Sequence, residues 1–227
     1  MFEGVLDEKR ISLLADLTSL EAVRPFYLAG GTALSLQLGL RVSVDFAFFS
    51  PRHFNADSLC AELQARFSNT RVIVIEPDTC DLLIEDVQVS FFGYPYALVN
   101  DLVQGTDALR ELRMASPEDI AAMKLSAIGS RGSRKDFYDL YQIYQRVPGF
   151  DGRRLLDVAR AKFGRERDIG YMLMGLGYFE SADSETLPKT FVSADWEEIK
   201  RFFREEQHRL FEEEEIRARR AFYADRG

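Results

Sequence analysis

Two short motifs carry residue types that could bind a phosphorylated ligand. The first, Leu28-Ala29-Gly30-Gly31-Thr32, places a glycine pair between an apolar run and a helical pattern. Such a turn lets the backbone approach a ligand closely, and the N–H groups at a helix start attract phosphate. The alternative is a tight turn that only reverses the chain, since glycine pairs are common in such turns.

The second motif is Arg41-Val42-Ser43-Val44-Asp45. Asp45 is the lone carboxylate in a strand that we predict over residues 42–49, where an unpaired charge is costly. A period of two places Asp45 on the same strand face as Ala47. Two interpretations stay open: Asp45 binds a metal ion, or it pairs with a base such as Arg41.

A third group of charged residues lies in the second half of the chain. Lys124 and Arg131 are two turns apart along one predicted helical face, and Asp136 and Asp139 share a face of the next helix. Residues 131–167 contain ten Lys or Arg and five Asp or Glu, so this basic segment is where a polyanion would dock. The alternative is a helical hairpin with ordinary surface charges.

These motifs require a scaffold, and the first half of the chain alternates between helical and strand patterns. The order helix, strand, helix, strand, helix, then several strands favours a sheet with helices packed on it. We predict helices over 7–22, 32–38 and 55–67, and strands over 26–29, 42–49, 72–75, 82–84 and 87–92.

The second half is helical in pattern. Ser116-Pro117-Glu118-Asp119 combines a cap, a first-turn proline and acidic residues, which is typical of a helix start. Near the end, Glu212–Glu215 followed by Arg217 indicates an exposed helix with i,i+4 ion pairs. We predict helices to about 129, over 134–146, 152–163 and 167–179, a polar loop over 181–189, and a terminal helix from about 195.

The composition is that of a globular protein. Of 227 residues, 46% are hydrophobic, and 29 basic against 37 acidic residues give a net charge of −8, which disfavours nonspecific coating of nucleic acid. Two cysteines without a C-x-x-C motif argue against a zinc ribbon or a disulfide scaffold. An acidic start and the lack of a long apolar run predict a cytoplasmic protein without a membrane span.

Together, these segments resemble the AbiEii/AbiGii toxin-type nucleotidyltransferases of the DNA polymerase β-like superfamily, found in toxin–antitoxin and phage-defence systems. The resemblance rests on FYLAGGTALSLQLGLRVSVDFAFFS and DIAAMKLSAIGSRGSRKDFYDLYQIY, and it spans about residues 10–205. It implies an α+β fold in which an N-terminal nucleotidyltransferase-type mixed sheet is flanked by helices and followed by an all-helical half. We predict a sheet domain over 1–110 and a helical domain over 111–227.

The resemblance also implies a reaction and its residues. Nucleoside monophosphate would pass from an NTP bound with Mg²⁺ to an RNA acceptor, commonly tRNA, or to a protein hydroxyl, and a cognate antitoxin would regulate the protein. Asp45 would bind Mg²⁺, Lys124 would contact phosphate, and Asp136, with Asp139, would act as a base or an orienting group. The implied nucleotide-binding residues are Gly30, Gly31, Thr32, Arg41, Ser43 and Lys124.

The sequence departs from the family pattern at three positions. Ala47 replaces the second carboxylate of the Asp-x-Asp pair, Leu40 replaces a frequent histidine, and Ser90 stands where a further acid is common. Two-metal chemistry needs a bridging acid that Ala47 does not supply. We therefore predict impaired transfer, and the alternative is a degenerate, non-catalytic module that binds nucleotide, RNA or a partner.

Overall fold

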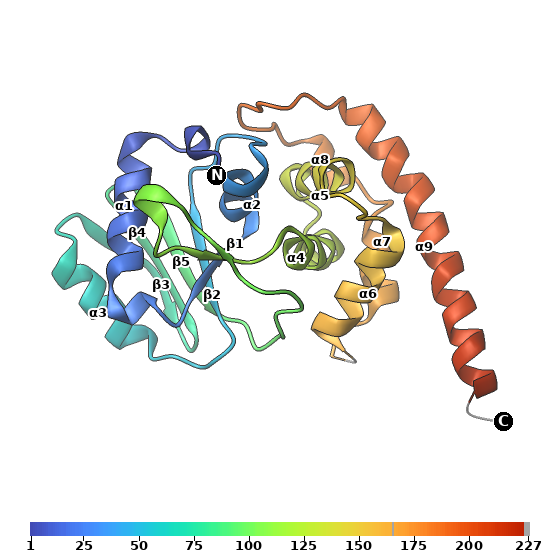
Figure 1. The fold of residues 1–227 in the computed structure, drawn as a ribbon, viewed down its shortest axis with the longest axis horizontal. Helices are drawn as coiled ribbons and strands as arrows, with labels where there is room; N and C mark the ends of the chain where they lie inside the picture. The colour runs from blue at the N-terminus through green and yellow to red at the C-terminus, as the bar shows by residue number, and fades with distance from the viewer. Residues whose placement is uncertain (165, 225–227) are drawn as a thin grey trace. The chain divides into compact units, whose positions relative to one another are not determined.

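The computed structural model describes residues 1–164 and 166–224, with the backbone alone described for Glu3 and residues 218–224. Seven strands form one mixed sheet in this part of the chain, in the order β3-β4-β5-β2-β1-β7-β6 (Figure 1). β2 is parallel to β5 and β1 is parallel to β7, whereas the other neighbours are antiparallel. The strands are β1 (Tyr27–Ala29), β2 (Phe46–Ser50), β3 (Thr70–Glu76), β4 (Thr79–Ile84), β5 (Val87–Gly93), β6 (Val103–Gln104) and β7 (Arg113–Met114).

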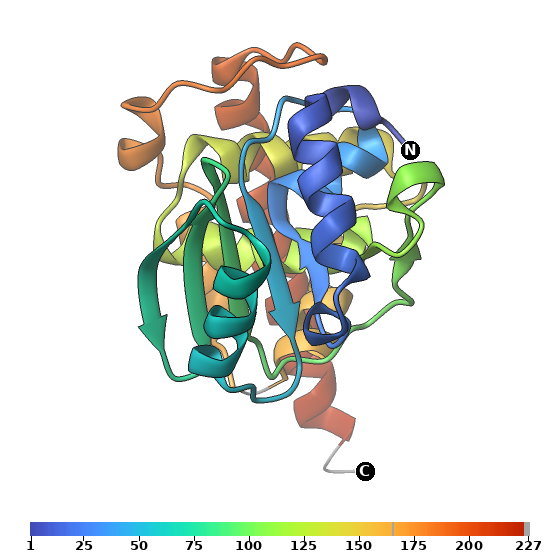
Figure 2. The same cartoon turned by 90° about the vertical axis from the view of Figure 1, so that its left-hand side faces the viewer.

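Helices α1 (Glu8–Ser19) and α3 (Ala56–Arg66) lie over one face of this sheet (Figure 2). Phe48 and Phe91, which are partners on β2 and β5, point to this face and are 1% and 0% exposed. On the opposite face, the partners Phe49 and Phe92 are only half-buried. The sheet therefore has one fully covered face and one face that stays partly accessible.

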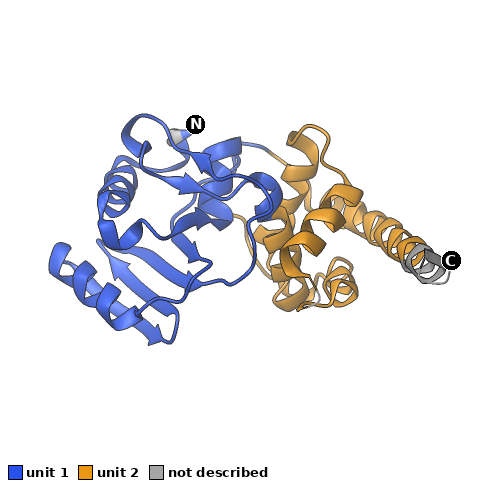
Figure 3. Cartoon of the chain, turned by 60° about the horizontal axis from the view of Figure 1, so that its bottom comes forward, with its two compact units in different colours: residues 1–120, 188–192 blue, residues 121–187, 193–227 orange. Residues whose placement is uncertain are grey.

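The chain divides into two compact units (Figure 3). Unit 1 contains residues 1–120, with the sheet, and takes back the short segment 188–192. Unit 2 contains residues 121–187 and those from 193 onward. The predicted division at residue 110 stays a prediction. The predicted α+β class is confirmed, because a mixed sheet with flanking helices precedes a helical region.

Most helices begin and end near the predicted positions, because their apolar period is long and their caps are explicit. Asp7, for example, caps α1 by accepting a hydrogen bond from the Arg10 N–H at 2.8 Å. The short helix α8 (Glu180–Asp183) overlaps the start of the predicted polar loop over 181–189, which is a difference from the sequence pattern. The remaining helices are α2 (Gly30–Leu38), α4 (Pro117–Ser130), α5 (Arg134–Arg146), α6 (Gly152–Phe163), α7 (Ile169–Gly175), α8 (Glu180–Asp183) and α9 (Trp196–Ala224).

β2 is shorter than the predicted strand over 42–49. Its partner β1 ends at Ala29, which pairs with Ala47, so the residues before Phe46 have no ladder to join on that side. The chain turns into α2 directly after Ala29. Asp45 consequently precedes the strand, and the expectation that it stands within one is wrong.

The segment before β2 is held by the returning segment 188–192 instead. The Val42 N–H donates to the Lys189 carbonyl at 2.9 Å, and the Phe191 N–H donates to the Leu40 carbonyl at 2.8 Å. These two bonds join stretches of chain about 150 residues apart, estimated from their numbering. The sequence pattern did not indicate this pairing. Among the described residues, no helix has the length and apolar character needed to cross a membrane.

Candidate functional site

The diglycine turn stands where β1 ends and α2 begins. Gly30 has a φ of +70°, in the left-handed region that favours glycine. A Cβ on Gly31 would collide with the guanidinium group of Arg41. The N-cap residue Ala29 makes no side-chain cap hydrogen bond, so no side chain at that position satisfies the N–H groups of the first turn. Glycine is therefore favoured at position 30 by its backbone conformation and at position 31 by the close approach of Arg41.

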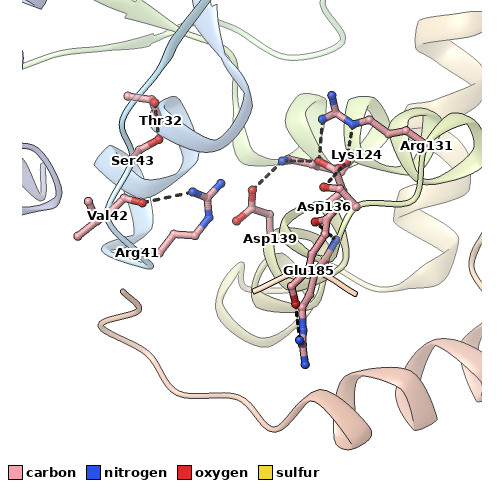
Figure 4. A network of polar contacts seen from close by, with 11 residues as sticks. Thr32, Arg41, Val42, Ser43, Lys124, Arg131, Asp136, Asp139 and Glu185 are labelled. Carbon is pink, nitrogen blue, oxygen red and sulfur yellow. Dashed lines mark hydrogen bonds and ion pairs between the residues drawn. The ribbon is translucent and has the colours of Figure 1, made fainter. Parts of the chain in front are cut away.

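Arg41 adds a positive charge next to this helix start. Its side chain is buried at 4% exposure, and a guanidinium N–H donates to the Val42 carbonyl at 3.3 Å (Figure 4). The N-terminal end of a helix already carries partial positive charge, so a cation beside it makes the site favourable for an anion. Gly31 thus makes room for Arg41. The guanidinium group of Arg41 and the N-terminal end of α2 together form an electropositive corner.

Thr32 and Ser43 join the two sequence motifs. Both side chains are buried, and their hydroxyl oxygens lie 2.6 Å apart (Figure 4). The Thr32 hydroxyl donates its single hydrogen to the Asp45 carbonyl, so Ser43 is the donor to Thr32. These hydroxyl groups therefore position the Asp45 backbone against the start of α2.

Asp45 itself is exposed, so its carboxylate stays hydrated and does not carry the desolvation cost expected of an acid inside an apolar strand. Two residues on, Ala47 pairs with Ser90 on β5. Ser90 in turn pairs with Asp81 on β4, and its hydroxyl donates to Asp81 Oδ1 at 2.7 Å. One row across the sheet thus reads Ala47, Ser90, Asp81.

These residues do not fit the two-metal site that the family resemblance implies. Among the described residues, no group of three His, Cys, Asp or Glu side chains could hold a metal ion. Position 47 supplies no donor atom, and the Ser90 hydroxyl is hydrogen-bonded to Asp81. Asp81 also accepts a hydrogen bond from Gln88 at 2.9 Å. Asp45 remains as a single carboxylate at the start of β2.

The second group of predicted site residues forms a buried ion cluster in unit 2. Lys124 Nζ lies 2.9 Å from Asp136 Oδ1 and 2.7 Å from Asp139 Oδ2 (Figure 4). Arg131 Nε lies 2.9 Å from Asp136 Oδ2, and the Ser133 hydroxyl donates to the same oxygen at 3.1 Å. Two cations and two carboxylates give this cluster no net charge.

The surroundings of Asp136 decide its protonation. Burial alone would raise the pKa of this carboxyl, but the charges of Lys124 and Arg131 and their hydrogen bonds outweigh burial and hold the pKa well below its usual range. A carboxylate with such a low pKa is a poor general base at neutral pH. The cluster therefore favours the orienting role for Asp136 among the two that were left open.

One comparison with known proteins identifies the family, and a second finds a relative along most of the chain. The family described as "Nucleotidyl transferase AbiEii toxin, Type IV TA system" matches residues 72–223. The protein aq_aa25 of Aquifex aeolicus (strain VF5), described as uncharacterized, is 34% identical over 201 residues, which cover 88% of this chain and 94% of that protein. The chain belongs to the AbiEii nucleotidyltransferase toxin family. The family match begins after the diglycine turn, so it does not depend on that motif.

The AbiEii assignment is accompanied by distant similarity to solved nucleotidyltransferases. The Megavirus polyadenylate synthase aligns with a TM-score of 0.45 at 13% identity, covering 63% of this chain and 32% of that protein. The chain thus spans about a third of its length. ANT(2")-Ia in complex with adenylyl-2"-tobramycin aligns with a TM-score of 0.31 at 16% identity, covering 74% of this chain and 91% of that protein. Both similarities are too low to assign a ligand.

In this AbiEii family member the predicted site residues fall into two groups, one in each unit. Unit 1 brings together Gly30, Gly31, Thr32, Arg41 and Ser43, with Asp45 adjoining. Unit 2 brings together Lys124, Arg131, Asp136 and Asp139. The catalytic and binding roles assigned to them stay predictions.

The sequence analysis missed Asp81, the only carboxylate in the row Ala47, Ser90, Asp81 across the sheet. Asp81 lies beside Ser90 because β4 and β5 pair in antiparallel register around it. The period of two in Thr79–Ile84, combined with the tight connection from Ile84 to Val87, was the available signal. To infer that Asp81 lies beside Ser90, one needs the register of the hairpin and not only the strand pattern.

In the part of the chain that the structure describes, ion pairs engage Arg131, Arg153 and Arg160 of the basic segment over 131–167. Arg153 lies 2.7 Å from Glu213 of α9, and Arg160 Nε donates to Glu214 of the same helix at 3.2 Å. Arg165, also counted in that segment, lies outside the described residues. Glu213 and Glu214 of α9 therefore face α6 and offset the charges of Arg153 and Arg160, and the expectation of i,i+4 pairs within α9 is not met at these two glutamates.

Proposed function

We propose that this protein binds a nucleoside triphosphate through unit 1, and that its transfer of the nucleoside monophosphate to an acceptor is impaired by Ala47. The acceptor in this proposal is an RNA, such as tRNA, or a protein hydroxyl. Membership in the AbiEii family supports the reaction class. Regulation by a cognate antitoxin belongs to the same proposal and is suggested by the family description.

The observation that carries the proposal is the pairing of Ala47 with Ser90 on the strand that starts beside the electropositive corner. Arg41 and the start of α2 are suited to a triphosphate, because both favour negative charge. Next to them, the two positions where family members carry acids hold an alanine and a serine. Phosphate binding is thus supported, whereas catalysis is not.

The family generally uses a divalent metal ion, and Mg²⁺ is the ion that we propose to accompany the NTP. Because the donor set of this chain does not fit a metal pair, nucleotide binding here rests on Arg41 and the helix start. Loss of even an indirect metal partner costs about 10–100-fold in affinity or activity, and a missing ligand costs at least as much. The phosphate contact that the family resemblance implies for Lys124 stays a separate prediction, and within unit 2 Asp136 and Asp139 hold its ammonium group.

The second candidate is a non-catalytic module that binds nucleotide, RNA or a partner protein. The Ser90–Asp81 hydrogen bond favours it, because the serine is engaged in the sheet rather than available for a metal ion. The two candidates share the same phosphate-binding corner and differ in whether any transfer remains.

Labelled transfer separates these candidates. The parent, Ala47→Asp and the matched control Ala47→Asn are each incubated with the four labelled NTPs, Mg²⁺ and total tRNA. The proposal expects transfer by Ala47→Asp to exceed that of the parent by at least about tenfold, whereas Ala47→Asn stays at the parent level because an amide is a weaker metal ligand.

Each other outcome has a definite meaning. Equal rates for the parent and Ala47→Asp contradict impairment at position 47. NTP binding without transfer in any variant selects the non-catalytic module. A parent that binds no NTP at all contradicts the proposed function altogether.

A further inference from the structure

Four half-buried aromatic side chains gather on the partly accessible face of the sheet in unit 1, beside the buried Tyr27, whose ring stacks on Phe49 at 6.1 Å. This aromatic platform consists of Phe49 on β2, Phe92 on β5, and Tyr94 and Tyr96 just beyond β5. The ring centroids of Phe49 and Phe92 are 5.5 Å apart, those of Phe49 and Tyr94 are 5.3 Å apart, and those of Tyr94 and Tyr96 are 4.8 Å apart. The four rings therefore form one continuous cluster.

The platform differs from the aromatic core on the other face of the same strands. Phe48 and Phe91 stack there at 5.1 Å and are 1% and 0% exposed, which is ordinary core packing under the helices. All four platform residues are only half-buried. Part of their aromatic surface therefore stays accessible to a ligand on this face.

The register places the platform directly beside the candidate site. Phe49 and Phe92 are partners in the β2–β5 ladder, and Ala47 and Ser90 are the partners two residues before them. Because side chains two residues apart on a strand share a face, the platform lies about 6.6 Å further along the face that carries Ala47. β1 runs antiparallel to β2, so the diglycine turn after Ala29 lies at the Ala47 end of this face.

This order along the sheet matches the parts of a nucleotide. The electropositive corner of Arg41 and the α2 start suits phosphates, and the cluster of tilted and edge-to-face aromatic rings one step away offers ring faces and edges to a base. Nucleobases stack on aromatic side chains, and such stacking tolerates any base because every base has a π-face.

We propose that the aromatic platform is a stacking surface for a nucleobase next to the phosphate-binding corner. This inference rests on the proposed function for the position of the phosphates. The base comes from the bound NTP or from an RNA acceptor, since both present the same flat ring. Because the contact is stacking rather than edge recognition, the platform discriminates little among the four bases.

Binding measurements with three probes test the platform. ATP carries a base and phosphates, inorganic tripolyphosphate carries phosphates alone, and a short single-stranded oligoribonucleotide carries bases without a triphosphate. The full-length parent is compared with Phe92→Leu and Tyr94→Leu, which keep apolar volume but remove the aromatic ring. Phe211→Leu, at a half-exposed phenylalanine of α9 in unit 2, is the matched control.

The inference expects the platform variants to lose affinity for a base-bearing probe by at least about fivefold, since a lost stack corresponds to roughly that factor or more. Tripolyphosphate affinity stays within about twofold of the parent, because no base is involved. A loss for ATP assigns the base to the NTP, and a loss for the oligoribonucleotide alone assigns it to the RNA. The control changes neither.

Two results overturn the inference. Equal losses for ATP and tripolyphosphate mean that the rings only support the fold near the phosphate site, and thermal melting of each variant shows that effect directly. Unchanged affinities for all three probes mean that no base stacks there. A parent that binds neither ATP nor tripolyphosphate contradicts the proposed function instead, and the oligoribonucleotide then decides the platform by itself.

Discussion

Burial separates two aspartates that the sequence analysis assigned to one catalytic site. Asp45 is exposed at the start of β2, where its carboxylate is open to solvent and to a ligand. Asp136 is fully buried, and Lys124, Arg131 and Ser133 donate hydrogen bonds to its oxygens. The first residue is therefore suited to binding, and the second is suited to holding Lys124 in place.

Removal of these carboxylates should affect stability very differently. Asp136→Asn leaves a buried lysine and an arginine without their partner, which we expect to lower the free energy of unfolding by about 3–5 kcal/mol. Asp45→Asn changes an exposed group, and we expect an effect within about 0.5 kcal/mol. Chemical denaturation of both variants measures the difference. Comparable losses for the two variants would contradict the roles assigned here.

The low pKa of Asp136 also predicts how stability depends on pH. In the unfolded chain an aspartate takes up its proton near pH 4, whereas the folded Asp136 does so only at lower pH. Its contribution is therefore complete above about pH 4 and is lost as the pH falls toward the folded pKa. The stability gap between the parent and Asp136→Asn should narrow below about pH 4 in denaturation curves. A gap that widens in acid has the opposite sign and rules this account out.

Gly31 tests the electropositive corner at the same scale. A Cβ at this position must displace the end of the flexible Arg41 side chain, so Gly31→Ala should move the guanidinium group while leaving the fold intact. We expect tripolyphosphate affinity to fall by about tenfold, with a stability loss of no more than about 1–3 kcal/mol. Gly4→Ala is the control, because a Cβ there meets nothing within 4 Å. Unchanged affinity in Gly31→Ala would separate Arg41 from phosphate binding.

At the scale of secondary structure, elements with a long apolar period were predictable and short pairings were not. The α5 helix follows the predicted range because 13 residues repeat the pattern three or four times. The two-residue strands β6 and β7 carry too few residues for any period, and the sequence analysis did not find them. The start of β2 was predicted too early for a related reason. Because β1 and β2 are antiparallel, β2 can begin only where β1 ends, and the sequence does not show where β1 ends.

In the candidate site too, residues within local motifs were predictable, and residues placed by distant contacts were not. Gly30, Gly31, Thr32 and Ser43 were predicted from local motifs, and they do lie together. Asp81 and the partners of the α9 glutamates depend on register and on packing between distant segments, which a single sequence does not display. Local chemistry was thus visible in the sequence, whereas contacts between distant elements were not.

The ion pairs between α6 and α9 are expected to lower the affinity of the protein for RNA. Glu213→Gln combined with Glu214→Gln removes the partners of Arg153 and Arg160, and we expect tRNA affinity at low salt to rise several-fold, to about three- to tenfold. Exposed pairs contribute little to stability, so the free energy of unfolding should change by less than about 1 kcal/mol for each pair.

The control for this experiment is the double variant Glu205→Gln and Glu212→Gln, which changes the net charge equally at two exposed positions of α9. Filter binding of tRNA over a salt series compares the two doubles. If both raise affinity alike, net charge alone explains the effect and the α6 arginines have no special part in it.

At the scale of the whole molecule, the electropositive corner occurs together with the row Ala47, Ser90, Asp81, in which only Asp81 is a carboxylate. The corner comes from unit 1, in which the returning segment 188–192 pairs with the residues next to Arg41. The net charge of −8 means that any anion must be attracted locally rather than by the protein as a whole. Nucleotide binding without a metal pair is the property that we propose on the basis of this combination.

The affinity for ATP with and without a divalent metal ion tests that property most directly. In the parent, chelation of Mg²⁺ should change the affinity by less than about threefold, whereas Ala47→Asp should lose about 10–100-fold on chelation because the added carboxylate holds the ion. A parent whose ATP binding falls tenfold or more when Mg²⁺ is removed would contradict the account, because the described residues would then hold a metal site that their positions do not form.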